Sequence, residues 1–106
     1  MENGLNITIM DDVLEFIGTL PLKEQNKILG AVNTLGNKKF EEVYVKQIVG
    51  NIKELKIKRY RLIFFIHQSE IFLIRIFVKK SKKTPKLEIE LALKFYKSFI
   101  QFSQNI

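Results

Sequence analysis

The chain has 106 residues, enough for one domain with one core, and almost half of them are apolar, which favours a packed fold over disorder. It contains no cysteine, which excludes disulfides and thiolate metal sites, and its single histidine argues against a zinc site. No run approaches the roughly 18 to 20 uncharged apolar residues of a membrane helix. The N-terminus carries acids and does not resemble a secretory signal. We therefore expect one domain, residues 1–106, in a reducing cytoplasm, with no membrane contact, metal or other cofactor.

The net charge of +7 is distributed unevenly along the chain. Residues 1–30 hold five acids against two lysines, whereas residues 38–61 hold eight basic and three acidic residues. Residues 79–86 hold five lysines and no acid. The two basic segments form one patch if the strands that carry them pair, and such a patch would attract a polyanion over roughly a Debye length. The alternative is a basic surface that only keeps the protein in solution.

The first half of the chain predicts two helices. Asp11 or Asp12 can cap the first, whose apolar residues follow at helical spacing until Pro21 ends it. The second runs from about residue 22 to residue 35, and Gly36 ends it, so the two form a helical hairpin. A short strand can precede this hairpin, and residues 37–51 are compatible with either a strand or a turn of helix.

From residue 52 the apolar residues recur with a period of two, which indicates strands. Three strands, at residues 52–58, 60–67 and 71–79, are joined by short connections, and this predicts an antiparallel meander. The aromatic residues expected in its core are Phe64, Phe65 and Phe72.

A last helix is expected after the meander. Thr84 would cap it, and Pro85 would be its first residue, where the missing N–H has no helical partner to lose. Its apolar residues recur at helical spacing and predict a buried face made of Leu87, Leu91, Phe95, Phe99 and Phe102. The predicted fold class is α+β: an N-terminal helical hairpin packed on an antiparallel β-meander, with a C-terminal helix and all helices on one side of the sheet.

The meander brings basic residues together that are distant in sequence. Arg61 opens the second strand, and Lys79 and Lys80 end the third, so antiparallel pairing places these ends side by side. Lys56 and Lys58 are expected to share the outward face of the first strand. Because arginine offers a planar fork that binds two phosphate oxygens at once, the arrangement predicts a phosphate site.

Three blocks of sequence carry a further signal: Glu54-Leu55-Lys56, Tyr60-Arg61, and the run Phe77 to Pro85, followed by Ala92 in the last helix. Together they resemble the RelE/ParE superfamily of bacterial toxins, and most closely its phage-derived HigB-like branch, in which an arginine usually stands at the position of Lys56. The resemblance covers about residues 13–97. It implies a small toxin that pairs with an antitoxin. RelE-like members cut messenger RNA in the ribosomal A site, whereas ParE-like members act on DNA gyrase.

The resemblance implies RNA cleavage by lysine and arginine without a metal. Attack by a 2′-hydroxyl needs a base, cations for the charge that develops on the phosphate, and an acid for the leaving oxygen. As a hypothesis, Arg61 and Lys79 or Lys80 hold the phosphate, and Lys56 or Lys58 supplies the base or further charge. The residues expected to contact RNA are Lys46, Lys80, Lys82, Lys83 and Tyr60. The alternatives are a solvated turn for the lysines and a plain strand aromatic for Tyr60. His67 is expected to be structural or exposed, and Arg75 to pair with an acid.

The leading hypothesis is therefore a cytoplasmic toxin of a type II toxin-antitoxin system, a ribosome-dependent mRNA endonuclease and RNA-binding hydrolase. Its partners would be a cognate antitoxin, in an assembly up to a heterotetramer, and the ribosome with its mRNA. One alternative is a ParE-like inhibitor of DNA gyrase that cuts no RNA. Another is a basic nucleic-acid-binding module, although the chain lacks a helix-turn-helix and an aromatic RNA-binding signature.

Overall fold

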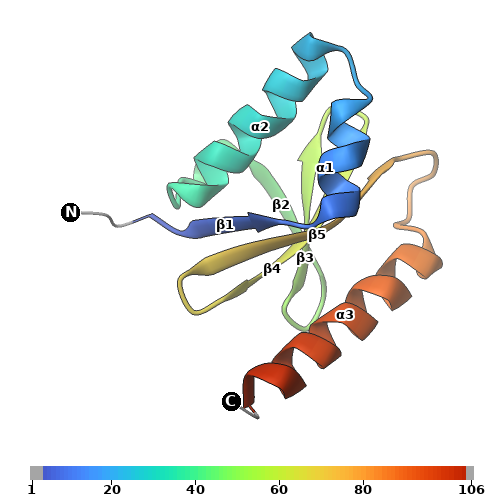
Figure 1. Ribbon diagram of the computed structural model, residues 1–106. Helices are drawn as coiled ribbons and strands as arrows, with labels where there is room; N and C mark the ends of the chain where they lie inside the picture. The colour runs from blue at the N-terminus through green and yellow to red at the C-terminus, as the bar shows by residue number, and fades with distance from the viewer. Residues whose placement is uncertain (1–3, 105–106) are drawn as a thin grey trace.

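A computed structural model describes residues 4–104 of the chain. Five strands form one sheet in the order β1-β5-β4-β3-β2 (Figure 1). The strands are β1 (Asn6–Ile9), β2 (Tyr44–Val49), β3 (Ile52–Ile57), β4 (Tyr60–His67) and β5 (Glu70–Val78). The predicted antiparallel meander is confirmed, and β2 extends it at one side. The short first strand is present as well, but it pairs in parallel with β5, so the sheet is mixed.

Helices cover both faces of this sheet. They are α1 (Asp11–Gly18), α2 (Leu22–Gly36) and α3 (Lys86–Gln104), with a 3₁₀ turn, η1 (Phe40–Glu42), before β2. The hairpin of α1 and α2 lies on one face, and α3 crosses the opposite face (Figure 1). The α+β class is confirmed, but the prediction that all helices lie on one side is wrong. Within residues 4–104, no helix combines the length and the apolar character needed to cross a membrane.

Each face of the sheet has its own apolar core. The core beneath α1 and α2 joins helix residues such as Val13 and Ile28 to strand residues such as Phe64. The core beneath α3 is centred on Phe65, whose ring stacks on that of the half-buried Phe72 with centroids 5.1 Å apart. The three phenylalanines predicted for the core are therefore divided between the two faces. Full burial of such side chains contributes roughly 1.5–3 kcal/mol each, so both helical layers are held mainly by apolar contact.

The C-terminal helix is held less completely than its apolar spacing predicts. Phe95 and Phe99 pack against the sheet, but the side chains of Leu87, Leu91 and Phe102 are 63%, 38% and 66% exposed. The predicted buried face is thus correct for the middle of the helix and wrong for these three positions.

The start of α3 is secured by two polar contacts. Arg75 of β5 donates to both carboxylate oxygens of Glu88, over 2.6 and 3.3 Å. The pairing expected for Arg75 is confirmed, with the acid supplied by the helix. Thr84 does not cap the helix as predicted: its hydroxyl donates to Glu54 on β3, and the first helical N–H groups donate to the carbonyl of Pro85.

A β-bulge at Ile74 decides which face the end of β5 presents. The register of β5 against β4 shifts there, and Ile74 is skipped in the pairing. Ile74 packs beneath α3, and the next residue, Arg75, also reaches α3, so the alternation of the strand is reset. As a result Phe77 lies opposite Arg61, and β5 delivers Lys79 to the same face as Arg61.

Candidate functional site

A cavity of about 200 Å³ opens on the α3 face of the sheet, where β2, β3 and β4 meet the end of β5. We call it the basic cavity. It is lined by Tyr44, Lys46, Glu54, Lys56, Arg61, Lys79 and Lys82. Five basic side chains thus surround a single carboxylate, and the excess positive charge makes the cavity a site for anions.

The register of the sheet assembles this cavity. Lys46 lies opposite Glu54, and Lys56 lies between Tyr44 on one side and Arg61 on the other. Directly opposed residues of an antiparallel pair project to the same face, with Cβ atoms about 4.5–5.5 Å apart. Residues from β2, β3, β4 and the loop after β5 therefore converge, although none of them is adjacent in sequence.

Arg61 lies beneath the cavity and is already engaged by the protein. Its side chain is 10% exposed, and its Nε lies 3.9 Å from Oε1 of Glu54. Its Nη1 donates to the carbonyls of Lys58 and Tyr60 over 2.7 and 2.8 Å. The predicted convergence of Arg61 with Lys79 is confirmed. The prediction of a free bidentate fork is wrong, because the guanidinium already binds two backbone carbonyls and lies beside the Glu54 carboxylate.

Glu54 is the residue that sequence reasoning missed at this site. Its side chain is 3% exposed and faces Arg61 with one oxygen, while the other accepts the Thr84 hydroxyl over 2.7 Å. Thr84 follows directly after the lysine-rich loop, residues 79–83, so Glu54 attaches the end of that loop to the sheet. An isolated acid in a strand with basic residues on both sides was the available signal, because a buried carboxylate requires such partners.

The tyrosine that was predicted to contact RNA is buried, and a different tyrosine lies at the basic cavity. Tyr60 is 2% exposed, its hydroxyl donates to Glu24, and its ring contacts Phe16 edge to face. Buried in this way, it has no face to offer an RNA base. Tyr44, by contrast, is 63% exposed at the rim of the basic cavity, with the Lys56 ammonium 5.2 Å from its ring centroid. It lies in the segment whose structure the sequence left open, and only the pairing with β3 reveals its place.

Lys56 and Lys58 do not share a face, contrary to the prediction. Lys56 lines the basic cavity, whereas Lys58 lies in the turn after β3 with a φ of 54°. Its ammonium lies close enough to Lys27 of α2 that repulsion lowers the pKa of Lys27. The strand ends at Ile57, so the period of two no longer applies to Lys58, which joins the α2 side of the molecule.

Two of the remaining three lysines predicted to contact RNA lie at or beside the basic cavity. Lys82 lines it, and Lys83 lines an adjacent cavity of about 240 Å³ that shares Lys46 with the first. Lys80 is exposed in the same loop but lines neither cavity. The strip that runs from Lys82 through Lys46 to Lys83 is therefore continuous.

His67 lies at the other end of β4. It lies six positions after Arg61 along the strand, a span of about 20 Å at 3.3 Å per residue. Its ring contacts Phe99 of α3 edge to face, with centroids 5.3 Å apart. This position agrees with the expectation that His67 is structural or exposed.

Comparison with solved structures defines the class of the protein by its fold. The chain is similar to the archaeal RelE–RelB complex from Pyrococcus horikoshii OT3, with a TM-score of 0.57 and 17% identity over 71% of this chain and 94% of that chain. It is also similar to the RelB–RelE antitoxin–toxin complex from Methanococcus jannaschii, with a TM-score of 0.57 and 12% identity over 66% of this chain and 87% of that chain. The fold is thus that of RelE, as the sequence predicted.

A match to a family model assigns the chain to a narrower group than its fold does. Residues 15–97 match the model of the family described as phage derived protein Gp49-like (DUF891). The match spans most of the chain, so the protein belongs to this Gp49-like family. No curated protein matches the chain.

Proposed function

We propose that this chain is the toxin of a toxin-antitoxin system and that it cleaves messenger RNA on the ribosome without a metal ion. Membership of a RelE-like toxin family supports the first part. The observation that carries the second is the basic cavity, where five cationic side chains converge on one small volume. Inhibition of a protein target does not require such a cavity, whereas a reaction at phosphorus does.

The cavity suits the charge that develops during RNA cleavage. The 2′-oxygen gives its proton to a base and attacks the neighbouring phosphorus, the bond from phosphorus to the 5′-oxygen breaks, and the leaving 5′-oxygen takes a proton from water, so that a cyclic phosphate and a 5′-hydroxyl result. Ammonium groups at Lys46, Lys79 and Lys82 would stabilise the phosphorane oxygens. Arg61 would add its field from beneath while remaining bound to backbone carbonyls.

The proton of the 2′-hydroxyl needs a base within hydrogen-bonding reach. Of the two lysines that the sequence suggested, only Lys56 lines the cavity, so we assign it this role and exclude Lys58 from it. A lysine acts as a base in its neutral form. Lys83, beside the cavity, would follow the RNA backbone, and the exposed ring of Tyr44 would stack on an unpaired base next to the scissile bond.

The partner of the proposed toxin is a cognate antitoxin. Both structural relatives are complexes of RelE with RelB, and the second is described as an antitoxin–toxin complex. By analogy we expect a stable complex in the cytoplasm, up to a heterotetramer, in which the antitoxin prevents access to messenger RNA.

Primer extension on cellular messages after a brief induction tests the proposal. Breaks at a fixed phase within codons are expected. Lys79→Ala and Lys56→Ala should each reduce their rate by roughly 10²- to 10⁴-fold, the usual range for groups that stabilise charge or transfer a proton. Lys97→Ala, an exposed lysine on α3, is the matched control and should leave the breaks unchanged. Intact messages together with arrested replication would replace the proposal with inhibition of DNA gyrase.

A further inference from the structure

Part of strand β5 has no strand paired on one of its two sides, although β5 is not the outermost strand of the sheet. Strand β1 pairs with β5 only over residues 70–73, and the last contact is the Met10 N–H donating to the Leu73 carbonyl over 3.1 Å. The chain then turns into α1 and leaves the sheet. Residues 74–78 of β5 therefore have β4 on one side and, within the described part of the chain, no strand on the other. We call residues 74–78 the open edge.

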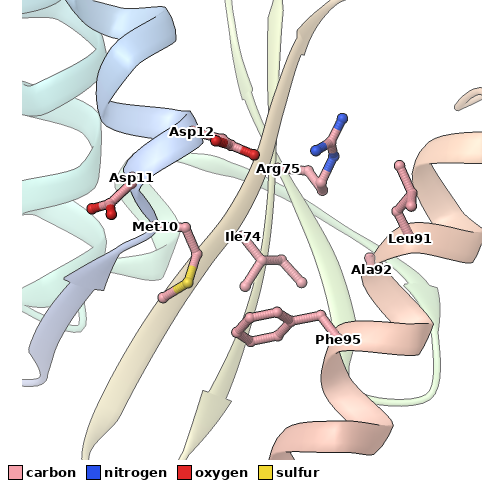
Figure 2. Close-up of a pocket in the computed structure, with 8 residues that line it drawn as sticks. All are labelled: Met10, Asp11, Asp12, Ile74, Arg75, Leu91, Ala92 and Phe95. Atoms are coloured by element: carbon pink, nitrogen blue, oxygen red, sulfur yellow. The ribbon is translucent and has the colours of Figure 1, made fainter.

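A groove runs along this open edge between α1 and α3. Figure 2 shows its first part, with the start of α1 on one side of β5 and α3 on the other. This part is a cavity of about 390 Å³, whose apolar lining includes Met10, Ile74, Leu91 and Phe95. A second cavity of about 250 Å³ shares Ile74 and continues along the strand to Ile76. Together the two cavities form what we call the edge groove.

The open edge carries only part of the protection that edge strands usually have. Such edges normally carry lysine, proline or a bulge that disturbs pairing. The rim strand β2 follows this rule, with Lys46 and a bulge between Gln47 and Val49. The open edge has the bulge at Ile74, but it holds no lysine or proline: its residues are four apolar ones and Arg75, which is bound to Glu88. Beyond the bulge, this apolar edge is a place where another strand can be added.

The backbone of the open edge is oriented to accept such a strand. The N–H of Lys79 donates to the Arg59 carbonyl over 2.8 Å and so points toward β4. Because alternate residues of a strand point their backbone groups to opposite sides, those of Ile76 and Val78 face the groove. An extended segment in the groove would take the position that β1 abandons after Leu73.

Acidic residues lie at one end of the edge groove and lysines at the other. Asp11 and Asp12, both exposed, stand at the end where α1 begins, and neither forms a salt bridge within residues 4–104. Lys79 and Lys80 follow directly after the other end. From residue 74 to residue 79 a strand spans about 17 Å. A segment of five or six residues therefore meets acids at one end and lysines at the other.

We propose that the edge groove binds an extended segment of the antitoxin, which adds to the sheet beside β5. Its core is aliphatic, a basic side chain lies toward Asp11 and Asp12, and an acidic side chain lies toward Lys79 and Lys80. Only the identity of the partner rests on the proposed function; the chemistry of the segment rests on the groove. Since Lys79 also lines the basic cavity, the acidic end of the segment would compete there with RNA phosphate.

Synthetic peptides test this chemistry directly. The probes are acetyl-Lys-Val-Thr-Val-Glu-amide and the same peptide in reverse order, which carry the predicted charges in the two possible strand directions. One of them should shift the amide resonances of residues 74–78 in the spectrum of the ¹⁵N-labelled protein. Methylation of its valine nitrogens removes the main-chain donors and should weaken binding by about tenfold or more. Replacement of its lysine by glutamate should weaken binding as well.

Two pairs of protein variants separate the groove from the general surface. Leu91→Glu places a charge in the groove wall and should abolish the shifts, whereas Leu87→Glu, one turn earlier and outside the groove, should preserve them. Asp12→Asn should weaken binding severalfold, and Glu15→Gln, an exposed acid of the same helix, should not. The unshifted remainder of each spectrum verifies the fold.

The proposal is overturned if neither peptide shifts residues 74–78, or if the methylated peptide binds equally well. It is also overturned if Leu91→Glu and Leu87→Glu behave alike. None of these measurements involves RNA or cell growth. If the RNA-cleavage proposal fails, the proposal for the edge groove is therefore unaffected. If peptide binding fails, the RNA-cleavage proposal is unaffected.

Discussion

Glu54→Ala tests whether the buried carboxylate organises the basic cavity. The substitution leaves Arg61 buried with no carboxylate beside it, and it deprives the Thr84 hydroxyl of its acceptor. Removal of one member of a buried ion pair typically costs about 3–5 kcal/mol of unfolding free energy. The 3.9 Å separation and the two carbonyls that Arg61 also binds place this pair at the lower end of that range.

The loss expected for Glu54→Ala is therefore about 3–4 kcal/mol, the hydrogen bond from Thr84 included. The unfolding free energy of a domain of this size is about 5–15 kcal/mol, so the variant should still fold. Its melting temperature should fall by roughly 15 °C. Thr84→Val removes only the hydrogen bond and should cost about 1 kcal/mol. Glu54→Gln keeps an acceptor for Thr84 but removes the charge that faces Arg61, and should fall between the two.

Urea denaturation followed by circular dichroism measures these losses, with the slope of the transition as a check that the denatured state is unchanged. In the double variant Glu54→Ala/Thr84→Val the two losses should not add, because both remove the same hydrogen bond. A loss below about 1 kcal/mol for Glu54→Ala would refute the account of Glu54 as the residue that joins Arg61 and the lysine loop. So would strict additivity in the double variant.

Four further outcomes are expected. Arg75→Leu should lower the unfolding free energy by about 1–2 kcal/mol, since it breaks the two-bond contact to Glu88, and it should speed hydrogen exchange in the first turn of α3 more than elsewhere; equal acceleration throughout would contradict this. Lys58→Met should return the pKa of Lys27 upward toward 10.5 in a pH titration followed by NMR, because the repulsion that lowers it is removed. In the unaltered protein the same repulsion makes stability rise with pH between the lowered pKa and 10.5, since there the unfolded chain holds the proton that the folded chain has lost. Gln68→Asn, in the β4–β5 turn at a φ of 57°, should raise stability by about 0.5 kcal/mol in urea denaturation, because asparagine adopts this left-handed conformation more readily.

The local sequence pattern of the chain was sufficient to predict its helices and most of its strands. The helical hairpin, the meander from residue 52 onward and the last helix follow from spacings of near four and of two, which each segment carries within itself. Antiparallel connection by short turns was also sufficient to bring Arg61 and Lys79 to one end of the sheet.

The contents of the basic cavity required the tertiary structure. The bulge at Ile74 inserts one residue into β5, and without it Lys79 would point to the opposite face from Arg61. Tyr44 enters the site only because β2 pairs with β3 in one particular register. Lys58 leaves it because the turn ends the alternation one residue earlier. None of these features has a local signature in the residues themselves.

The sequence by itself determined the α+β class, the two basic segments and the motifs that resemble the RelE-like family, because periodicity, turn chemistry and charge are properties of neighbouring residues. The tertiary structure decided that α3 lies across the sheet from α1 and α2, that Arg61 turns inward to Glu54, and that β5 keeps an open edge. These outcomes depend on which surfaces compete for burial once the sheet has formed, and that competition involves residues far apart in the chain.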